Sequence, residues 1–154
     1  MFLAKHSYYA KFYEDFLYRD HSHSFKQQAA IYLNRKKQFA LAFKWIDEAK
    51  IIAKGHRKIS IDNTYAVILF GANYDKIAED KNLITSLDES MEILTKCFES
   101  DRKKPYHAKV FADQAIKYAM ALPTSDNSKI YVKKAITWLN DRSIIIPNRN
   151  TNNL

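Results

Sequence analysis

Apolar residues recur at intervals of three and four along most of this chain. An α-helix has 3.6 residues per turn, so this spacing gathers them on one helical face. Segments with this spacing follow one another from residue 3 to residue 141. Two Gly and three Pro in 154 residues leave few breaks between the segments. The pattern therefore predicts an all-α protein and argues against a turn-rich β fold.

The positions of the expected breaks predict about seven helices, arranged as antiparallel hairpins. The expected ranges are about 3–19, 24–37, 39–54, 60–72, 86–100, 106–122 and 128–141. The range 60–72 is rich in β-branched residues and also fits a buried strand, but its helical neighbours favour a helix. Ser86 and Glu89 have the spacing of a capping box. We expect one repeat domain over residues 1–146 and a disordered Asn-rich tail at 147–154.

The second and third expected helices carry the most specific pattern in the chain. A tetratricopeptide repeat is a helical hairpin of 34 residues with small and large side chains at fixed offsets. With repeat position n at residue n + 22, positions 8, 11, 17, 20, 24 and 27 are Ala30, Leu33, Phe39, Ala42, Ile46 and Ala49. Small residues let two helices approach closely, and large ones fill the space beside them. Lys26, Ala29 and Lys54 depart from the repeat pattern, which has Trp, Leu and Pro there. We expect a tetratricopeptide-like array, with an unrelated helix bundle as the alternative.

Four segments carry a resemblance to a known family. They are residues 2–6 (FLAKH), 9–17 (YAKFYEDFL), 23–29 (HSFKQQA) and 63–70 (NTYAVILF). Together with the repeat hairpin, their order resembles the C-terminal repeat region of large bacterial anti-phage defence proteins. Those proteins carry a sirtuin-like or P-loop NTPase effector at the N-terminus, and their repeats bind a trigger or partner protein. The resemblance implies that this chain is the sensor or interaction end of such a system, a fragment of such a protein, or a stand-alone relative.

The sequence indicates no catalytic, cofactor or metal site. Cys97 is the one cysteine, which excludes an internal disulfide and a Cys-based zinc cluster. Its place beside Phe98 on a helix favours a buried thiol over a nucleophile. His21 and His23 could share a metal ion, but no third ligand is evident, so we interpret them as polar residues at a helix start. Phosphate-loop, dinucleotide-binding and metalloprotease motifs are absent from the sequence. We expect a protein that is not an enzyme.

Two further features bear on localisation. No apolar run in the sequence approaches the roughly 18 residues of a membrane span. Residues 1–6 lack the basic stretch and apolar core of a secretory signal. We therefore expect a cytoplasmic protein that does not bind membranes.

The net charge of +8 is spread unevenly along the chain. Lys and Arg exceed Asp and Glu by 7 in residues 1–60 and by 6 in residues 101–154, whereas residues 61–100 carry a net charge of −5. Such a distribution fits solvated helix faces, or surfaces that attract an acidic partner or a nucleic acid. Aromatic and basic residues also alternate between Lys5 and Arg19, but their helical spacing favours core packing over base stacking.

The repeat register also predicts a binding surface. In repeat arrays the first helix of each hairpin lines the concave surface. Positions 2, 5, 9, 12 and 13 are then Ser24, Gln27, Ile31, Asn34 and Arg35. Lys36 and Lys37 add positive charge at the tip of the hairpin. We expect partner binding at Gln27, Ile31, Asn34, Arg35, Lys36 and Lys37, with an acidic protein or peptide as the ligand. A nucleic acid is the alternative ligand, and an uncapped repeat end leaves self-association open.

Overall fold

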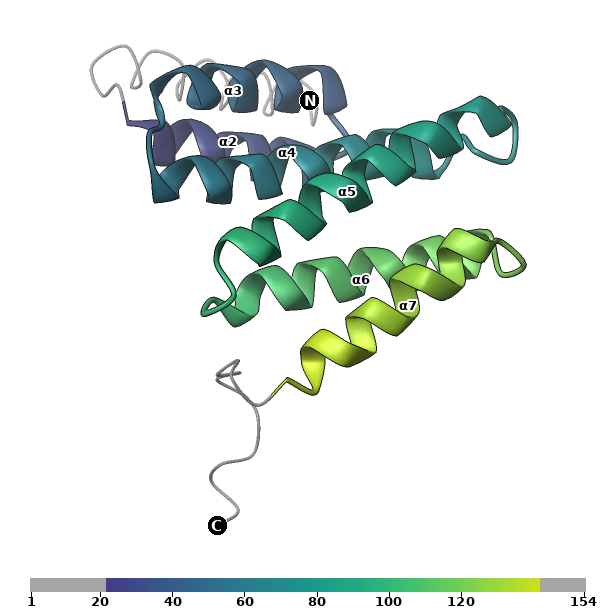
Figure 1. Ribbon diagram of the computed structural model, residues 1–154. Helices are drawn as coiled ribbons and strands as arrows, with labels where there is room; N and C mark the ends of the chain where they lie inside the picture. The colour runs from purple at the N-terminus through teal and green to yellow at the C-terminus, as the bar shows by residue number, and fades with distance from the viewer. Residues whose placement is uncertain (1–21, 142–154) are drawn as a thin grey trace, which may run out of the picture. The chain divides into compact units, whose positions relative to one another are not determined.

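The computed structural model describes residues 22–141 of the chain. This range contains six α-helices and one 3-10 helix, and none of its residues forms a strand (Figure 1). The helices are α2 (His23–Arg35), α3 (Phe39–Ile52), α4 (His56–Tyr74), η1 (Lys81–Leu83), α5 (Ile84–Ser100), α6 (Pro105–Ala121) and α7 (Asp126–Leu139). The all-α prediction is confirmed, and the ambiguous segment at 60–72 is helical. The expected first helix at 3–19 and the tail at 147–154 lie outside the described residues, so six of the seven expected helices are described here.

The chain divides into two compact units, residues 1–72 and residues 73–154. Each unit is described by itself below. The organisation as one repeat domain over residues 1–146 stays a prediction.

In the first unit, α2 and α3 pack against each other as an antiparallel hairpin (Figure 1). Its close contacts depend on small side chains, because Ala30, Ala42 and Ala49 are all fully buried. Leu33 and Ile46 fill the space beside them, and Phe39 packs against this core while partly buried. All six residues assigned to repeat packing positions therefore contribute to the core. The tetratricopeptide register itself stays a prediction.

The fourth helix completes the core of the first unit. Ile61 and Ile68 of α4 belong to the same buried cluster as the hairpin residues. Near its end α4 runs close to the tip of the hairpin: a Cβ atom at Gly71 would lie 3.3 Å from Asn34 Oδ1 and 3.4 Å from Phe39 Cε1. The shorter distance is tighter than ordinary van der Waals contact, so a glycine suits this position.

The turn between α2 and α3 has a defined backbone geometry. The Lys37 amide donates to the Asn34 carbonyl at 2.9 Å, and the Gln38 amide donates to the Leu33 carbonyl at 2.8 Å. This pair of bonds is the Schellman arrangement that closes many helix ends. It requires a left-handed residue after the C-cap, and here Lys37 takes that role with φ of 57°. A side chain with a Cβ is strained in this region, where glycine is usual.

Two expected helix boundaries differ from those in the structure. The capping box at Ser86 is wrong: α5 begins at Ile84, so Ser86 lies inside the helix and its carbonyl accepts a hydrogen bond from Ser90 Oγ at 3.0 Å. The side-chain cap lies earlier, where Asp80 Oδ1 accepts from the Asn82 amide at the start of η1. α4 begins at His56, four residues before the expected start, directly after Gly55 with its φ of 65°.

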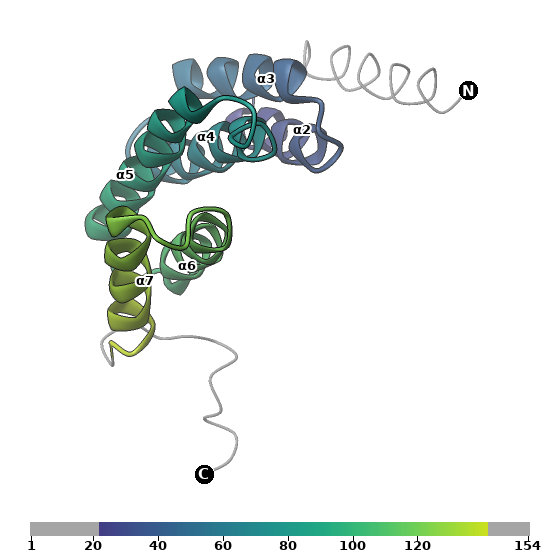
Figure 2. The same cartoon turned by 90° about the vertical axis from the view of Figure 1, so that its right-hand side faces the viewer.

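In the second unit, α5 packs against α6, and α6 and α7 form a second hairpin (Figure 2). On α5 a stripe of apolar residues is buried, formed by Leu87, Met91, Leu94 and Phe98. The single cysteine, Cys97, is buried as well. Aromatic rings join the helices, since Phe98 stacks on Trp138 with centroids 4.0 Å apart and Phe111 lies 4.6 Å from the same tryptophan. Within the described residues, no helix is both long and apolar enough to cross a membrane.

Candidate partner-binding surface

The orientation of α2 determines which of its residues a partner could reach. Lys26 points toward α3, where its Nζ lies 3.5 Å from Glu48 Oε2 and 5.6 Å from the centre of the Trp45 ring. Gln27 and Asn34 point toward α4. These contacts account for two sides of the helix and leave a third side for other contacts.

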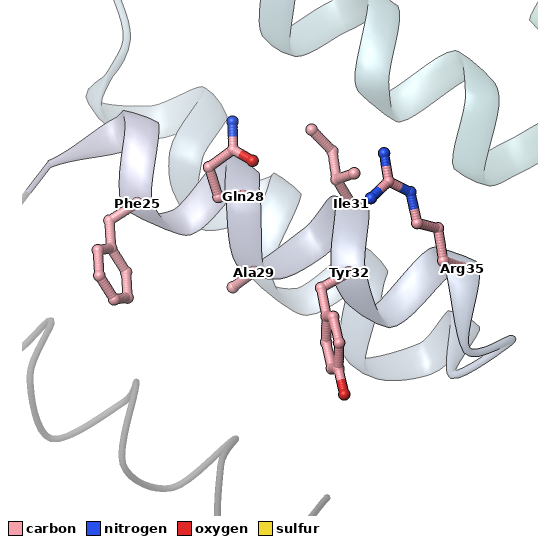
Figure 3. A pocket seen from close by; sticks show the side chains of 6 residues that line it. All are labelled: Phe25, Gln28, Ala29, Ile31, Tyr32 and Arg35. Atoms are coloured by element: carbon pink, nitrogen blue, oxygen red, sulfur yellow. The ribbon is translucent and has the colours of Figure 1, made fainter.

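A pocket lies along this third side of α2. The described residues that line it are Phe25, Gln28, Ala29, Ile31, Tyr32 and Arg35 (Figure 3). All six come from α2. Figure 3 shows that they form two strips whose side chains point in different directions. We call Phe25, Ala29 and Tyr32 the apolar strip, and Gln28, Ile31 and Arg35 the outer strip.

Each strip follows from the helical repeat. Steps of four and three residues separate the members of the apolar strip, and steps of three and four separate those of the outer strip. The outer strip offers an aliphatic side chain between an amide and a guanidinium group. Arg35 and Gln28 are exposed and Ile31 is half-buried. A peptide could therefore bury an apolar side chain on Ile31 and pair a carboxylate with Arg35.

The structure brings together only part of the predicted site. Ile31 and Arg35 line the same pocket. The Gln27 side chain instead donates hydrogen bonds to α4. Its Nε2 lies 2.9 Å from Ser60 Oγ and 3.0 Å from Thr64 Oγ1. Its side chain thus holds α2 to α4 rather than lining the pocket.

Asn34 is also turned inward. Its Oδ1 is buried and lies next to Gly71 of α4, and no hydrogen-bond donor reaches it within the part of the chain that the structure describes. Ser24, the remaining predicted position, is exposed near the start of α2, with its Oγ 3.3 Å from His23 Nδ1. Neither residue belongs to the outer strip.

The predicted basic tip follows directly on the outer strip. Arg35, Lys36 and Lys37 are consecutive and exposed, and they end α2 and form its turn to α3. The Lys36 ammonium lies 5.8 Å from the centre of the ring of Tyr32, which is one of the pocket residues. The tip thus places three positive charges at one end of a half-apolar surface.

The charge around this surface has one dominant sign. Residues 22–72 contain nine Lys and Arg against three Asp and Glu, a net charge of +6. Such an excess attracts anionic groups and raises the rate at which an acidic partner is encountered.

Sequence reasoning missed Gln28 and Tyr32. The repeat register selected residues by their offset in an ideal repeat. The simple spacing of α2 would have found both, because Gln28 lies three residues before Ile31 and Tyr32 lies three after Ala29.

A polar cluster in the second unit was also missed. One oxygen of Asp88, Oδ1, accepts hydrogen bonds from the hydroxyls of Tyr118 and Tyr131 at 2.8 Å each, and from Asn127 Nδ2 at 3.2 Å. Burial, with a further contribution from Asp88, raises the pKa of both tyrosines above the ordinary value. Neutral phenols that donate to a carboxylate in this way link α5, which carries Asp88, to α6 and α7.

Within residues 22–141 no group of three or more His, Cys, Asp or Glu side chains could hold a metal ion. His21, one of the two histidines considered for a metal, lies outside this range. His107 is buried at the start of α6, and this burial lowers the pKa of its imidazole.

Comparison with protein families, with characterised proteins and with solved structures finds no match to this chain.

Proposed function

We propose that this chain is a non-catalytic interaction module that binds an acidic segment of another protein along the outer strip of α2. The observation that supports the proposal most directly is the pocket on α2, where Ile31 and Arg35 lie side by side and the basic tip follows. A ligand that fits this surface carries an apolar side chain for Ile31 and carboxylates for Arg35 and the tip.

The proposed site differs from the set of residues that the sequence suggested. Ile31, Arg35, Lys36 and Lys37 stay in the proposed site, and Gln28 joins them. Gln27 and Asn34 serve the packing of α2 on α4 instead. The tetratricopeptide-like fold and a role as the interaction end of a bacterial defence system belong to this proposal, on the resemblance described above.

The experiment that tests the proposal is a selection from a displayed library of random peptides, using the whole chain as bait. We expect the enriched peptides to combine Asp or Glu with Leu, Ile or Phe. Parallel selections use two variants with the same change in net charge, Arg35→Glu in the outer strip and Lys58→Glu in the first turn of α4.

The outcomes separate a site from a general charge effect. Enrichment that persists in Lys58→Glu and disappears in Arg35→Glu supports the proposed surface. Enrichment that both variants lose equally reflects net charge alone and contradicts it. Failure to enrich acidic peptides from wild type also contradicts the proposal.

Nucleic-acid binding is the second candidate, favoured by the net charge of +6 in residues 22–72. Binding driven by phosphate contacts depends on released counterions, so it weakens steeply with salt. Fluorescence anisotropy with labelled random DNA and RNA tests it. Binding that is lost by about 0.3 M salt and weakened alike by Arg35→Glu and Lys58→Glu would favour this function.

A further inference from the structure

The outer strip offers a partner side chains rather than a sheet edge. Gln28, Ile31 and Arg35 point to the same side of α2 (Figure 3). The backbone amides and carbonyls between them are hydrogen-bonded within the helix, and the Lys37 and Gln38 amides close its last turn. An extended peptide gains affinity by pairing its backbone with a sheet edge, and a helix has none. A partner that lies along this strip therefore has to satisfy its own backbone groups, as a helix does.

The spacing of the outer strip also suits a second helix. Its steps of three and four residues form one ridge that runs about 10 Å along α2. A ridge of this kind packs beside the matching ridge of a neighbouring helix. Ile31 is half-buried at the middle of the ridge, while Gln28 and Arg35 are exposed one turn away on either side. The central side chain of the partner should therefore be apolar.

Charge distinguishes the two ends of the outer strip. Arg35 and Lys36 lie at its C-terminal end, whereas Gln28 at the other end is neutral. Residues 22–38, which include the whole of α2, contain no Asp or Glu. The acidic residues of a partner helix should therefore lie beside Arg35, one turn away from the apolar residue that contacts Ile31.

The helix dipole favours one direction for such a partner. The N-terminus of a helix carries partial positive charge and its C-terminus partial negative charge, so Asp or Glu in the first turn stabilises a helix. An antiparallel partner brings its N-terminus beside the C-terminal end of α2. Its acidic first turn then meets Arg35 and Lys36 and stabilises its own helix as well. In the parallel direction the same acids would lie in the partner's last turn, where the dipole disfavours them.

We propose that the partner segment is an amphipathic helix that lies antiparallel to α2, with an acidic first turn beside Arg35 and Lys36 and an apolar residue one turn later on Ile31. Read from its N-terminus, the segment carries Asp or Glu four residues before Leu, Ile or Phe. The position one further turn along lies beside Gln28 and needs no charge. This inference rests on the proposed function and adds the conformation and the direction of the ligand.

Peptides of about 16 residues, with blocked ends and an Ala-rich background, test the proposal against the whole chain. An acid-first peptide places Glu three and four positions before Leu, and an acid-last peptide has the reversed sequence. Both carry a hydrocarbon staple on the opposite face, and circular dichroism verifies that their helix contents are equal. Two unstapled acid-first peptides carry Pro either at the first residue, where helices tolerate it, or in the middle, where it breaks a helix.

Fluorescence anisotropy at low salt measures the affinity of each peptide for wild type and for Arg35→Glu, with Lys58→Glu as the control for net charge. We expect the acid-first peptide to bind wild type at least about threefold more tightly than the acid-last peptide. Pro in the middle should weaken binding at least about tenfold relative to Pro at the first residue, because it removes the helix. Arg35→Glu should weaken binding of the acid-first peptide more than Lys58→Glu does.

Equal affinities of the two proline peptides would overturn the helical conformation of the ligand. Equal or tighter binding of the acid-last peptide would overturn the antiparallel direction. Either result leaves the proposed function intact as long as Arg35→Glu still weakens binding. Binding of the acid-first peptide that is the same in Arg35→Glu and in wild type would instead contradict the proposed function, and this inference with it.

Discussion

The Gln27 side chain donates a hydrogen bond to Ser60 Oγ across 2.9 Å and thereby ties α2 to α4. The same amide nitrogen lies 3.0 Å from Thr64 Oγ1. Gln27 precedes the exposed Gln28 by one residue, but the two amides have different surroundings. One helps to hold the unit together, and the other lies in the outer strip.

Gln27→Ala should therefore lower stability. The substitution removes a donor from two part-buried hydroxyls, and a lost hydrogen bond of this kind costs about 1–2 kcal/mol. Gln28→Ala, the matched control at an exposed position, should change the free energy of unfolding by less than about 0.5 kcal/mol. Urea unfolding followed by circular dichroism measures both. Equal effects of the two substitutions would contradict the position of Gln27 between the helices.

Lys37→Gly should raise stability. Lys37 has a φ of 57°, and glycine occupies this region without a steric penalty, so we expect a gain of about 0.5–1 kcal/mol. Lys36→Gly removes the same charge at the preceding residue, where φ is −88° and glycine brings no relief. Thermal unfolding of the two variants should shift in opposite directions. A destabilised Lys37→Gly would mean that the lysine side chain contributes more than its backbone strain costs.

Asp88→Ala should destabilise the second unit. Tyr118 is fully buried, and without Asp88 its hydroxyl loses the acceptor that lies 2.8 Å away. The cost of an unpaired buried donor and of two further lost bonds is about 2–3 kcal/mol. Glu89→Ala removes a neighbouring exposed carboxylate and should have little effect. Urea unfolding compares them, and a loss below about 0.5 kcal/mol in Asp88→Ala would show that water replaces the carboxylate at little cost.

Stability should fall as the pH falls below about 6.5, in part because of His107. Burial is the largest cause of its lowered pKa, opposed by the charge of Asp101. The unfolded chain therefore binds a proton at a pH where the folded chain does not. The stabilisation is present above the unfolded pKa and is lost as the pH falls from there through the lower pKa of the folded chain.

His107→Gln isolates this effect from the other four histidines, which both chains share. The free energy of unfolding of wild type should fall more steeply than that of His107→Gln between about pH 7 and pH 5.5. Urea midpoints measured across this range check the expectation. Parallel pH profiles for the two chains would show that His107 titrates alike in the folded and unfolded states.

Local patterns predicted the helices well. Ala30, Ala42 and Ala49 lie at helical spacing and are fully buried in the α2–α3 hairpin. The start of α5 was predicted poorly, since Ser86 looks like a cap by itself. The residue that caps this region is Asp80, which acts on the preceding η1 turn. The η1 turn separates Asp80 from the start of α5 at Ile84. This turn has no clear apolar periodicity, so the sequence does not indicate it.

The contacts that orient the helices could not be predicted in this way. The rotation of α2 depends on Ser60 and Thr64, which lie 33 and 37 residues after Gln27 in the sequence. The partners of Asp88 are 30, 39 and 43 residues away from it. One sequence does not indicate which of many polar residues meet over such separations. The repeat register therefore did not predict that Gln27 and Asn34 lie against α4 rather than along the pocket.

The most direct test of the proposed function is the affinity of a selected acidic peptide for wild type and three variants, measured by fluorescence anisotropy at two salt concentrations. The account predicts that Arg35→Glu weakens binding at least about tenfold, which corresponds to about 1.4 kcal/mol, while Lys58→Glu changes it much less. Gln27→Ala should bind as wild type does when the chain is folded. An affinity that is equal in Arg35→Glu and wild type would contradict the assignment of the outer strip as the binding surface.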